Sequence, residues 1–254
     1  MIQKEWMTVT NQRNIANRIY ELTVRGGMVA SMEPGQFVHI RTGDSFEPLL
    51  RRPISIAAIN PEKSEFTMLY RVEGRGTEVL AAKRAGDKID VLGPLGNGFP
   101  IGEAKQKAVL IGGGIGVPPL YELACQLNAR GVETVHVLGF ETAEAVFYEK
   151  EFSVLGETHI TTVDGTHGIK GFVTHVMNEL PTDFDVYYSC GPSPMLKAVE
   201  ELYVDKKGFL SYEQRMGCGI GACFACVCKT NDERDYVKVC SDGPVFPAKV
   251  VVAG

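Results

Sequence analysis

The chain has 254 residues, of which 44% are hydrophobic and 22% charged, and its formal net charge is −5 at pH 7. Such a composition buries enough apolar surface to offset chain entropy, which excludes a disordered protein. The negative balance gives no reason to expect nucleic acid as a partner. No apolar run approaches the roughly 18 residues of a membrane helix, and residues 1–10 lack the apolar core of a signal peptide. We therefore expect a soluble, cytoplasmic protein that does not bind membranes.

Residues 1–100 have the pattern of short strands. Apolar and polar side chains alternate with a period close to two over residues 66–71. Further strands are expected at residues 19–25, 37–41, 54–58 and 89–92. Turn signals separate them, among them the Gly-Arg-Gly run at 74–76. Many short strands at this spacing favour an antiparallel barrel or sandwich.

Residues 101–208 change to an alternation of strands and helices. Strands are expected at residues 108–111, 135–138, 160–163 and 186–189, and helices at 118–130, 172–180 and 195–204. This alternation predicts a parallel sheet with helices on both faces. The remaining stretch, 209–254, is rich in loops and holds most of the cysteines, so three domains are predicted, with boundaries near residues 100 and 208.

Five of the seven cysteines crowd into residues 218–240. Cys218, Cys223 and Cys226 have the spacing C-x4-C-x2-C, and Cys240 follows after 13 intervening residues. This is the plant-type [2Fe–2S] spacing. Small residues at 217, 219, 221, 222 and 225 allow a tight loop whose N–H groups point inward. A zinc site would more often show paired short knuckles, and a purely structural thiol group is the third alternative. The spacing leaves out Cys228, which we interpret as a small buried hydrophobe.

A glycine-rich turn joins the first strand of the second domain to its first helix. Its glycines are Gly112, Gly113, Gly114 and Gly116. Main-chain N–H groups and a helix N-terminus at such a turn can bind phosphate, although a tight turn without a ligand would have the same sequence. Val117 stands where the usual dinucleotide fingerprint has a third glycine, so the turn is a variant.

Two further cysteines lie in the second domain. Cys190 ends a predicted strand and therefore lies at the carboxyl edge of the sheet, where open α/β folds bind ligands. A buried structural thiol is the alternative reading. Cys125 lies within a helix near its apolar stripe, and we interpret it as a core residue.

An arginine-rich segment in the first domain could bind phosphate. Residues 50–56 place Arg51, Arg52 and Ser55 beside a predicted strand. Arginine suits bidentate phosphate contacts, and Gly76 and Thr77 could add N–H and hydroxyl donors. By themselves these are also ordinary surface residues.

The order of these motifs resembles the ferredoxin–NADP reductase superfamily. An Arg-x-x-Ser strand domain precedes a parallel domain with Gly-Gly-x-Gly-x-x-Pro and Cys-Gly-Pro, and a two-iron loop follows. Residues 50–55, 90–99, 112–120 and 213–218 are most similar to the electron transfer subunits of NAD-dependent (class B) dihydroorotate dehydrogenases. The resemblance implies an antiparallel β-barrel FAD domain, a Rossmann-like α/β NAD domain and a small C-terminal [2Fe–2S] domain.

The resemblance also implies site residues. Cys218, Cys223, Cys226 and Cys240 would be the iron ligands, and Cys190 would lie at the hydride-transfer position beside the nicotinamide. Ile54 departs from the superfamily, which usually has an aromatic residue there. Glu141 follows the second strand of the parallel domain with no arginine nearby, which favours NAD over NADP. The FAD site would comprise Arg52, Pro53, Ile54, Ser55, Leu69, Tyr70, Arg71, Gly76 and Thr77.

The implied activity is a step of pyrimidine biosynthesis. Dihydroorotate would reduce FMN on a separate catalytic subunit, and electrons would then pass singly through [2Fe–2S] to FAD, which hands hydride to NAD⁺. Two copies of each chain would form a heterotetramer. Two alternatives remain open at this stage: a flavin and iron–sulfur NADH reductase that feeds an oxygenase or a soluble ferredoxin, and a non-enzymatic iron–sulfur sensor.

Overall fold

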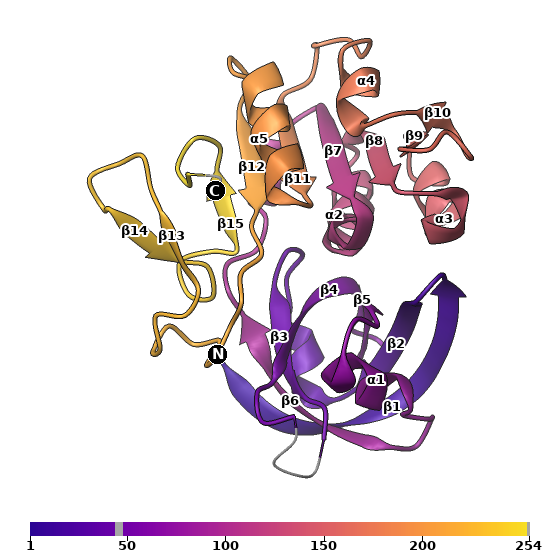
Figure 1. The fold of residues 1–254 in the computed structure, drawn as a ribbon, viewed down its shortest axis with the longest axis vertical. Coiled ribbons are helices and arrows are strands. Elements are labelled where there is room, and N and C mark those ends of the chain that lie inside the picture. Colours follow the sequence, from indigo (N-terminus) through magenta and orange to yellow (C-terminus); the bar gives the residue numbers. More distant parts are fainter. Residues whose placement is uncertain (44–47, 253–254) are drawn as a thin grey trace.

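Six antiparallel strands close into a barrel in the computed structural model, which describes residues 1–43 and 48–252 (Figure 1). Alternate side chains of these strands fill the barrel, as Leu22, Val38, Ile56 and Met68 do. The predicted antiparallel barrel is therefore confirmed. The strands are β1 (Gln3–Ala16), β2 (Ile19–Arg25), β3 (Phe37–Arg41), β4 (Arg52–Asn60), β5 (Glu65–Arg71) and β6 (Lys88–Leu95), in the order β1-β2-β5-β4-β3-β6.

Two elements of the barrel domain differ from expectation. The run 74–76, expected as a turn, begins the helix α1 (Arg75–Ala81), because the Thr77 hydroxyl accepts the N–H groups of Glu73 and Gly74 and caps the first turn. The 14-residue strand β1 had no alternating apolar pattern, because only Met7 and Val9 on it are fully buried. Its long pairings with β2 and β6 hold it in place.

A seven-stranded sheet forms the second half of the molecule, in the order β10-β9-β8-β7-β11-β12-β15. All neighbouring strands are parallel except β12 and β15. The strands are β7 (Lys107–Gly113), β8 (Glu133–Phe140), β9 (Glu157–Thr162), β10 (Ile169–Lys170), β11 (Val186–Cys190), β12 (Gly208–Ser211) and β15 (Val245–Pro247).

Helices cover both faces of this sheet, as predicted. Leu120 of α2 packs on the face that carries Leu110, whereas Val173 of α4 and Val199 of α5 pack on the face that carries Val109. The short helix α3 was not anticipated. The helices are α2 (Pro118–Ala129), α3 (Glu149–Ser153), α4 (Val173–Met177) and α5 (Ser193–Leu202).

The C-terminal stretch is joined to both other parts. β12 and β15 complete one edge of the large sheet, while β13 (Val227–Lys229) and β14 (Tyr236–Lys238) form a separate hairpin. One apolar core joins Phe37 and Leu95 of the barrel to Leu210 and Phe246, with Cys226 and Cys240 buried in it. Figure 1 shows this stretch in colours from orange (β12) to yellow (β13, β14 and β15), alongside both larger halves. The cysteines are thus packed against β3.

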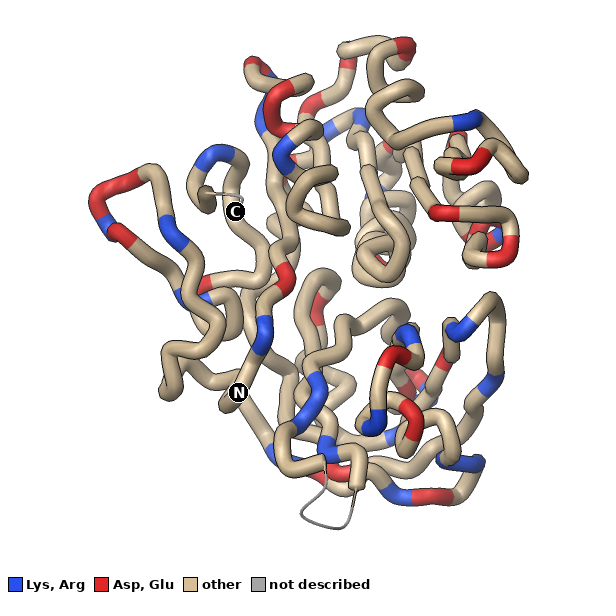
Figure 2. Tube along the Cα trace, in the orientation of Figure 1, with Lys and Arg blue, Asp and Glu red and all other residues tan. Residues whose placement is uncertain are grey.

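Charge is spread over the molecule. Figure 2 shows basic and acidic residues in both halves of the chain trace, so no half presents a field of one sign. Within the described ranges, no helix is long and apolar enough to cross a membrane.

Candidate functional site

The cysteine loop, residues 217–226, surrounds sulfur atoms with main-chain donors. The N–H groups of Ile220 and Ala222 point at the Cys218 Sγ from 3.4 and 3.2 Å, and the N–H group of Gly221 lies 3.1 Å from the Cys240 Sγ. Gly219 and Gly221 adopt left-handed φ values of 73° and 82°, which glycine reaches without strain. The loop therefore has the inward N–H groups expected from its small residues.

The four predicted ligand thiols lie in two pairs. The sulfurs of Cys226 and Cys240 are 3.2 Å apart, and Cys218 contacts the thiol of Cys223. Among the described residues, no group of three or more His, Cys, Asp or Glu side chains is arranged so that it could hold a metal ion. Two pairs of thiols fit a cluster of two metals with two protein ligands each better than they fit a four-ligand zinc site.

The acidities of these thiols also favour a metal. Burial raises the pKa of Cys218, but the N–H of Ile220, the Cys223 thiol and further N–H groups together lower it to about 7. Burial and the adjoining Cys226 raise the pKa of Cys240 to about 12. Two sulfurs this close do not both ionise without a cation between them, and thiolates are the form that binds metal. The donor set thus fits an iron–sulfur cluster.

Cys228 lies apart from these pairs. It is half-buried on β13 and packs against the apolar core that contains Phe246. Burial raises the pKa of its thiol, and Gln214 is its hydrogen-bonding neighbour. This placement agrees with the interpretation of Cys228 as a packing residue, while the ligand assignment itself stays a prediction.

The glycine-rich turn meets Cys190 at the carboxyl edge of the sheet. A Cβ at Gly116 would lie 2.4 Å from the Cys190 carbonyl oxygen, so only glycine permits this close approach of the turn before α2 to the end of β11. Gly112 and Gly113 are buried at the end of β7, and Gly114 has a φ of 53°. Glu141 is exposed just beyond the end of β8. The structure thus brings the predicted dinucleotide residues to one sheet edge.

The barrel reaches this same edge through Arg71. A Cβ at Gly114 would lie 3.2 Å from the Arg71 Nη2, so the guanidinium of β5 lies on the glycine-rich turn. Glu213, which lies two residues after β12, is close enough to Arg71 and to Cys190 for its carboxyl group to interact electrostatically with both. The predicted flavin and dinucleotide sites therefore adjoin one another, although Arg71 and Cys190 are far apart in the sequence.

The pKa values of Cys190 and Glu213 are both shifted where the flavin and dinucleotide sites adjoin. Burial, and then the Glu213 carboxylate, raise the pKa of the Cys190 thiol, which is 1% exposed. The Glu213 side chain reaches solvent, yet the protein around it desolvates its carboxyl and raises the pKa, an effect that Arg71 opposes. Cys190 is therefore a neutral thiol, suited to contact a ligand and not to attack one.

The predicted FAD residues separate into two groups. The Arg52 guanidinium packs on Gly76, since a Cβ there would lie 2.5 Å from the Arg52 Nε, and Thr77 follows in the first turn of α1. Pro53 and Ser55 are half-buried on the outer face of β4. Arg52, Pro53, Ser55 and Arg71 remain available to a ligand. The Thr77 hydroxyl, by contrast, bonds to the main chain of Glu73 and Gly74, and Gly76 is covered by Arg52.

The side chains of the second group face inward. Ile54 belongs to the barrel interior, and so does Tyr70, whose hydroxyl donates to the Gln12 Oε1 at 3.2 Å. Leu69 packs into the core shared with the large sheet. Because their side chains face inward, Ile54, Leu69 and Tyr70 can contact a cofactor only through main-chain atoms.

Sequence reasoning missed two residues at the site. Glu213 was recognised only as part of a motif, although a carboxylate that follows a strand at the Cys190 edge is itself a signal. His39 is fully buried on β3 with a Cβ at Gly219 only 2.6 Å from its Nδ1. Burial lowers the His39 pKa to about 4, against the opposing effect of the Cys218 main chain. Nothing in the sequence marked His39.

Comparison with known proteins agrees with this geometry. The family model of the iron–sulfur cluster binding domain of dihydroorotate dehydrogenase B matches residues 213–252. The chain is 63% identical to the dihydroorotate dehydrogenase B (NAD(+)) electron transfer subunit of Lysinibacillus sphaericus, over 99% of each chain. It is 58% identical to that of Bacillus cereus strain G9842, over 99% of this chain and 100% of the relative.

A solved structure supports the same conclusion. An NADH-dependent reduced ferredoxin–NADP oxidoreductase, studied for flavin-based electron bifurcation, superposes with a TM-score of 0.88 at 30% identity, covering 98% of this chain and 90% of that one. Full-length identity, the matched iron–sulfur domain and the shared fold together lead to one conclusion. The chain belongs to the family of dihydroorotate dehydrogenase B (NAD⁺) electron transfer subunits.

Proposed function

We propose that this chain transfers electrons between a catalytic partner that oxidises dihydroorotate and NAD⁺, a step of pyrimidine biosynthesis. The observation that carries the proposal is that the barrel contacts both the glycine-rich turn and the cysteine loop, so that the three proposed cofactor sites adjoin one another. Arg71 of the barrel lies on the glycine-rich turn of the sheet domain, and the cysteine loop packs on β3 of the same barrel. A chain that relays electrons needs such adjacent sites.

Each of the three stretches has its own task in this proposal. Residues 1–100 hold FAD through Arg52, Pro53, Ser55, Arg71, Gly76 and Thr77, with main-chain contacts from Ile54, Leu69 and Tyr70. Residues 101–208 hold NAD at Gly112, Gly113, Gly114 and Gly116, with Cys190 as the catalytic contact beside the nicotinamide. Residues 209–254 hold [2Fe–2S] through Cys218, Cys223, Cys226 and Cys240. A bound flavin supplies exchange between hydride and single electrons.

The protein's own residues orient the reactants. The Gly116 approach to Cys190 places the dinucleotide turn against the edge where the neutral thiol lies. Arg71 counters the Glu213 carboxylate there, and its guanidinium is positioned to bind phosphate or carboxylate oxygens. Glu141 at the end of β8 favours the ribose hydroxyls of NAD over the 2′-phosphate of NADP.

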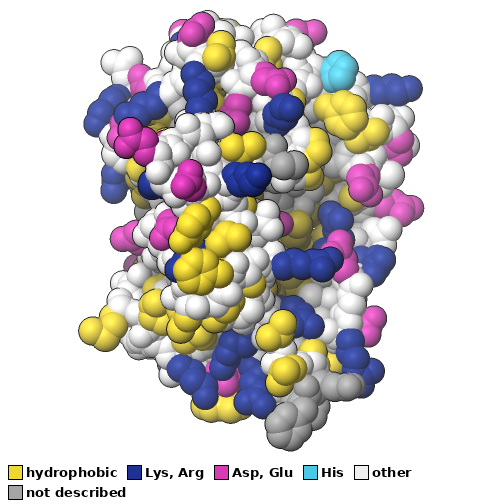
Figure 3. Space-filling view, turned by 60° about the vertical axis from the view of Figure 1, so that its left-hand side comes forward, with side chains coloured by type: hydrophobic (Ala, Val, Ile, Leu, Met, Phe, Trp, Pro, Cys, Tyr) yellow, Lys and Arg dark blue, Asp and Glu magenta, His cyan; other side chains and the backbone are white. Residues whose placement is uncertain are grey.

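The partner is proposed to be an FMN-containing catalytic subunit, with two copies of each chain in the complex. The cysteine-bearing stretch supports this, because it exposes Ile220, Phe224, Val227 and Tyr236 by 41–52%. Figure 3 turns this side of the molecule forward and shows hydrophobic side chains gathered on it. Cys223 is also exposed, so the predicted cluster site is reachable from this surface. The cytoplasmic location stays a prediction.

Reconstitution tests the proposal. The purified chain, loaded with FAD and iron, should oxidise NADH with an artificial acceptor yet leave dihydroorotate unchanged. Addition of the FMN-bearing subunit should start dihydroorotate-dependent reduction of NAD⁺. Reduction of NAD⁺ by dihydroorotate with the pure chain alone would contradict the proposal, and so would a chain that binds neither flavin nor iron. Light scattering of the mixture should give the mass of two copies of each chain.

A further inference from the structure

His39 is fully buried, and the polypeptide does not satisfy both of its ring nitrogens. Neither of its ring nitrogens forms a hydrogen bond of normal geometry within the described chain, although the main chain of Cys218 is close enough to act as a weak partner. Buried polar groups in native proteins are almost always paired, because leaving one unpaired is destabilising. At least one ring nitrogen therefore lacks a partner within the polypeptide.

The surroundings of His39 limit what this partner is. Val38 and Ile40, its neighbours on β3, fill the barrel interior, so the His39 side chain lies on the outer face of the barrel. There it is covered by the cysteine loop, because a Cβ at Gly219 would lie 2.6 Å from its Nδ1. The main chain of Cys218 is close enough to act as a hydrogen-bonding partner of the imidazole. The acceptor therefore belongs with the cysteine loop.

When the cysteine loop holds an iron–sulfur cluster, the sulfur atoms of the cluster and its ligands would be hydrogen-bond acceptors close to His39. The loop's own N–H groups already point at the sulfur of Cys218 and that of Cys240. A neutral imidazole carries one N–H donor and approaches from the barrel side, where the loop has glycine and no side chain. His39 also pairs through its main chain with Pro53 of the proposed FAD strand. His39 thus lies between the cysteine loop and the proposed FAD strand.

We propose that His39 donates a hydrogen bond to a sulfur atom of the iron–sulfur cluster held by the cysteine loop and thereby raises the reduction potential of that cluster. Donors to the sulfurs stabilise the extra negative charge of the reduced form, which is why they shift the potential upward. This inference rests on the proposed function, because it assumes that the loop holds the cluster.

The test compares His39→Leu with His39→Gln in the full chain loaded with FAD and iron. His39→Leu removes the donor, so the cluster potential should fall while iron content and FAD potential stay unchanged. His39→Gln keeps an N–H donor and should restore the potential at least in part. Phe37→Leu is the matched control, because it truncates a side chain on the same face of β3 without loss of a donor; its cluster potential should match the wild type.

A spectroscopic measurement makes the test independent of stability. Pulsed electron paramagnetic resonance of the reduced cluster in protein labelled with [15N]histidine should show a nitrogen coupling that is lost in His39→Gln. An unchanged cluster potential with no such coupling would overturn the inference. A shift in the FAD potential alone would also overturn it and assign the bond to flavin. A wild-type chain that binds no iron would instead overturn the proposed function, and this inference with it.

Discussion

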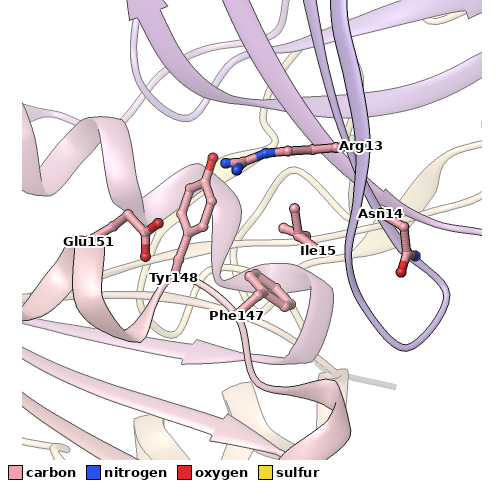
Figure 4. A pocket seen from close by; sticks show the side chains of 6 residues that line it. All are labelled: Arg13, Asn14, Ile15, Phe147, Tyr148 and Glu151. Atoms are coloured by element: carbon pink, nitrogen blue, oxygen red, sulfur yellow. The ribbon is translucent and has the colours of Figure 1, made fainter.

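Replacement of Tyr148 by phenylalanine should weaken the contact between the barrel and the sheet domain. The Tyr148 hydroxyl donates a 2.7 Å hydrogen bond to Glu21 on β2. Arg13 holds the same carboxylate, with its Nε at 2.7 Å and its Nη2 at 3.1 Å. Figure 4 shows the Tyr148 hydroxyl directed toward the Arg13 guanidinium across a pocket of 340 Å³. None of the residues lining that pocket belongs to a proposed cofactor site.

The magnitude follows from the burial of the carboxylate. Glu21 is only 6% exposed, so water does not replace the lost donor freely. The phenylalanine ring would keep the edge contact with Tyr121, whose centroid lies 5.0 Å away. The loss is therefore that of one hydrogen bond to a buried charge, about 1.5–3 kcal/mol. Arg13 still neutralises Glu21, which keeps the loss below that of an unpaired buried charge.

Urea unfolding of the full chain measures this loss as a lower midpoint with an unchanged slope. Tyr187→Phe is the matched control, because the Tyr187 hydroxyl is buried without a partner among the described residues; its removal should be neutral or stabilising. A double-mutant cycle with Glu21→Gln should assign the energy to the pair. A Tyr148→Phe midpoint equal to that of the wild type would refute the reasoning.

Four further predictions concern the cofactor sites and pH. Cys223→Ser should lose the cluster's visible absorption, whereas Cys228→Ser should keep two irons per chain; loss of iron from Cys228→Ser would refute the ligand assignment. NADH should reduce bound FAD with a far higher kcat/KM than NADPH because Glu141 repels the 2′-phosphate, and similar values would contradict this. Cys190→Ala should slow FAD reduction by NADH more than it weakens FAD retention. Burial lowers the pKa of His136 from 6.5 to about 4. Between these two pH values the unfolded state binds a proton that the folded state does not. The neutral, buried imidazole therefore contributes roughly 3 kcal/mol to the free energy of unfolding above pH 6.5, and this contribution should be lost as the pH falls from 6.5 to 4. Urea midpoints from pH 7 to pH 4 should show this slope, and His136→Gln should reduce it.

Local patterns in the sequence were sufficient for much of the fold. The period-two strands and the strand–helix alternation predicted the barrel and the parallel sheet, because a face buried along one element repeats at the period of that element. The cysteine spacing and the run Gly112 to Gly116 were readable for a similar reason: the groups that act together are close along the chain. Strand β1 was missed because few of its side chains reach the core.

Contacts between distant segments were decided only by tertiary structure. Arg71 contacts Gly114, Glu213 lies beside Cys190, and His39 is covered by Gly219. The two residues of each pair come from different elements, and the periodicity of an element does not reveal which other element will pack against it. The short strands β12 and β15 likewise joined the large sheet because its open edge offered main-chain hydrogen bonds. The sequence by itself determined which chemical groups the protein carries, and packing of the barrel, the sheet and the cysteine loop against one another decided which of those groups meet.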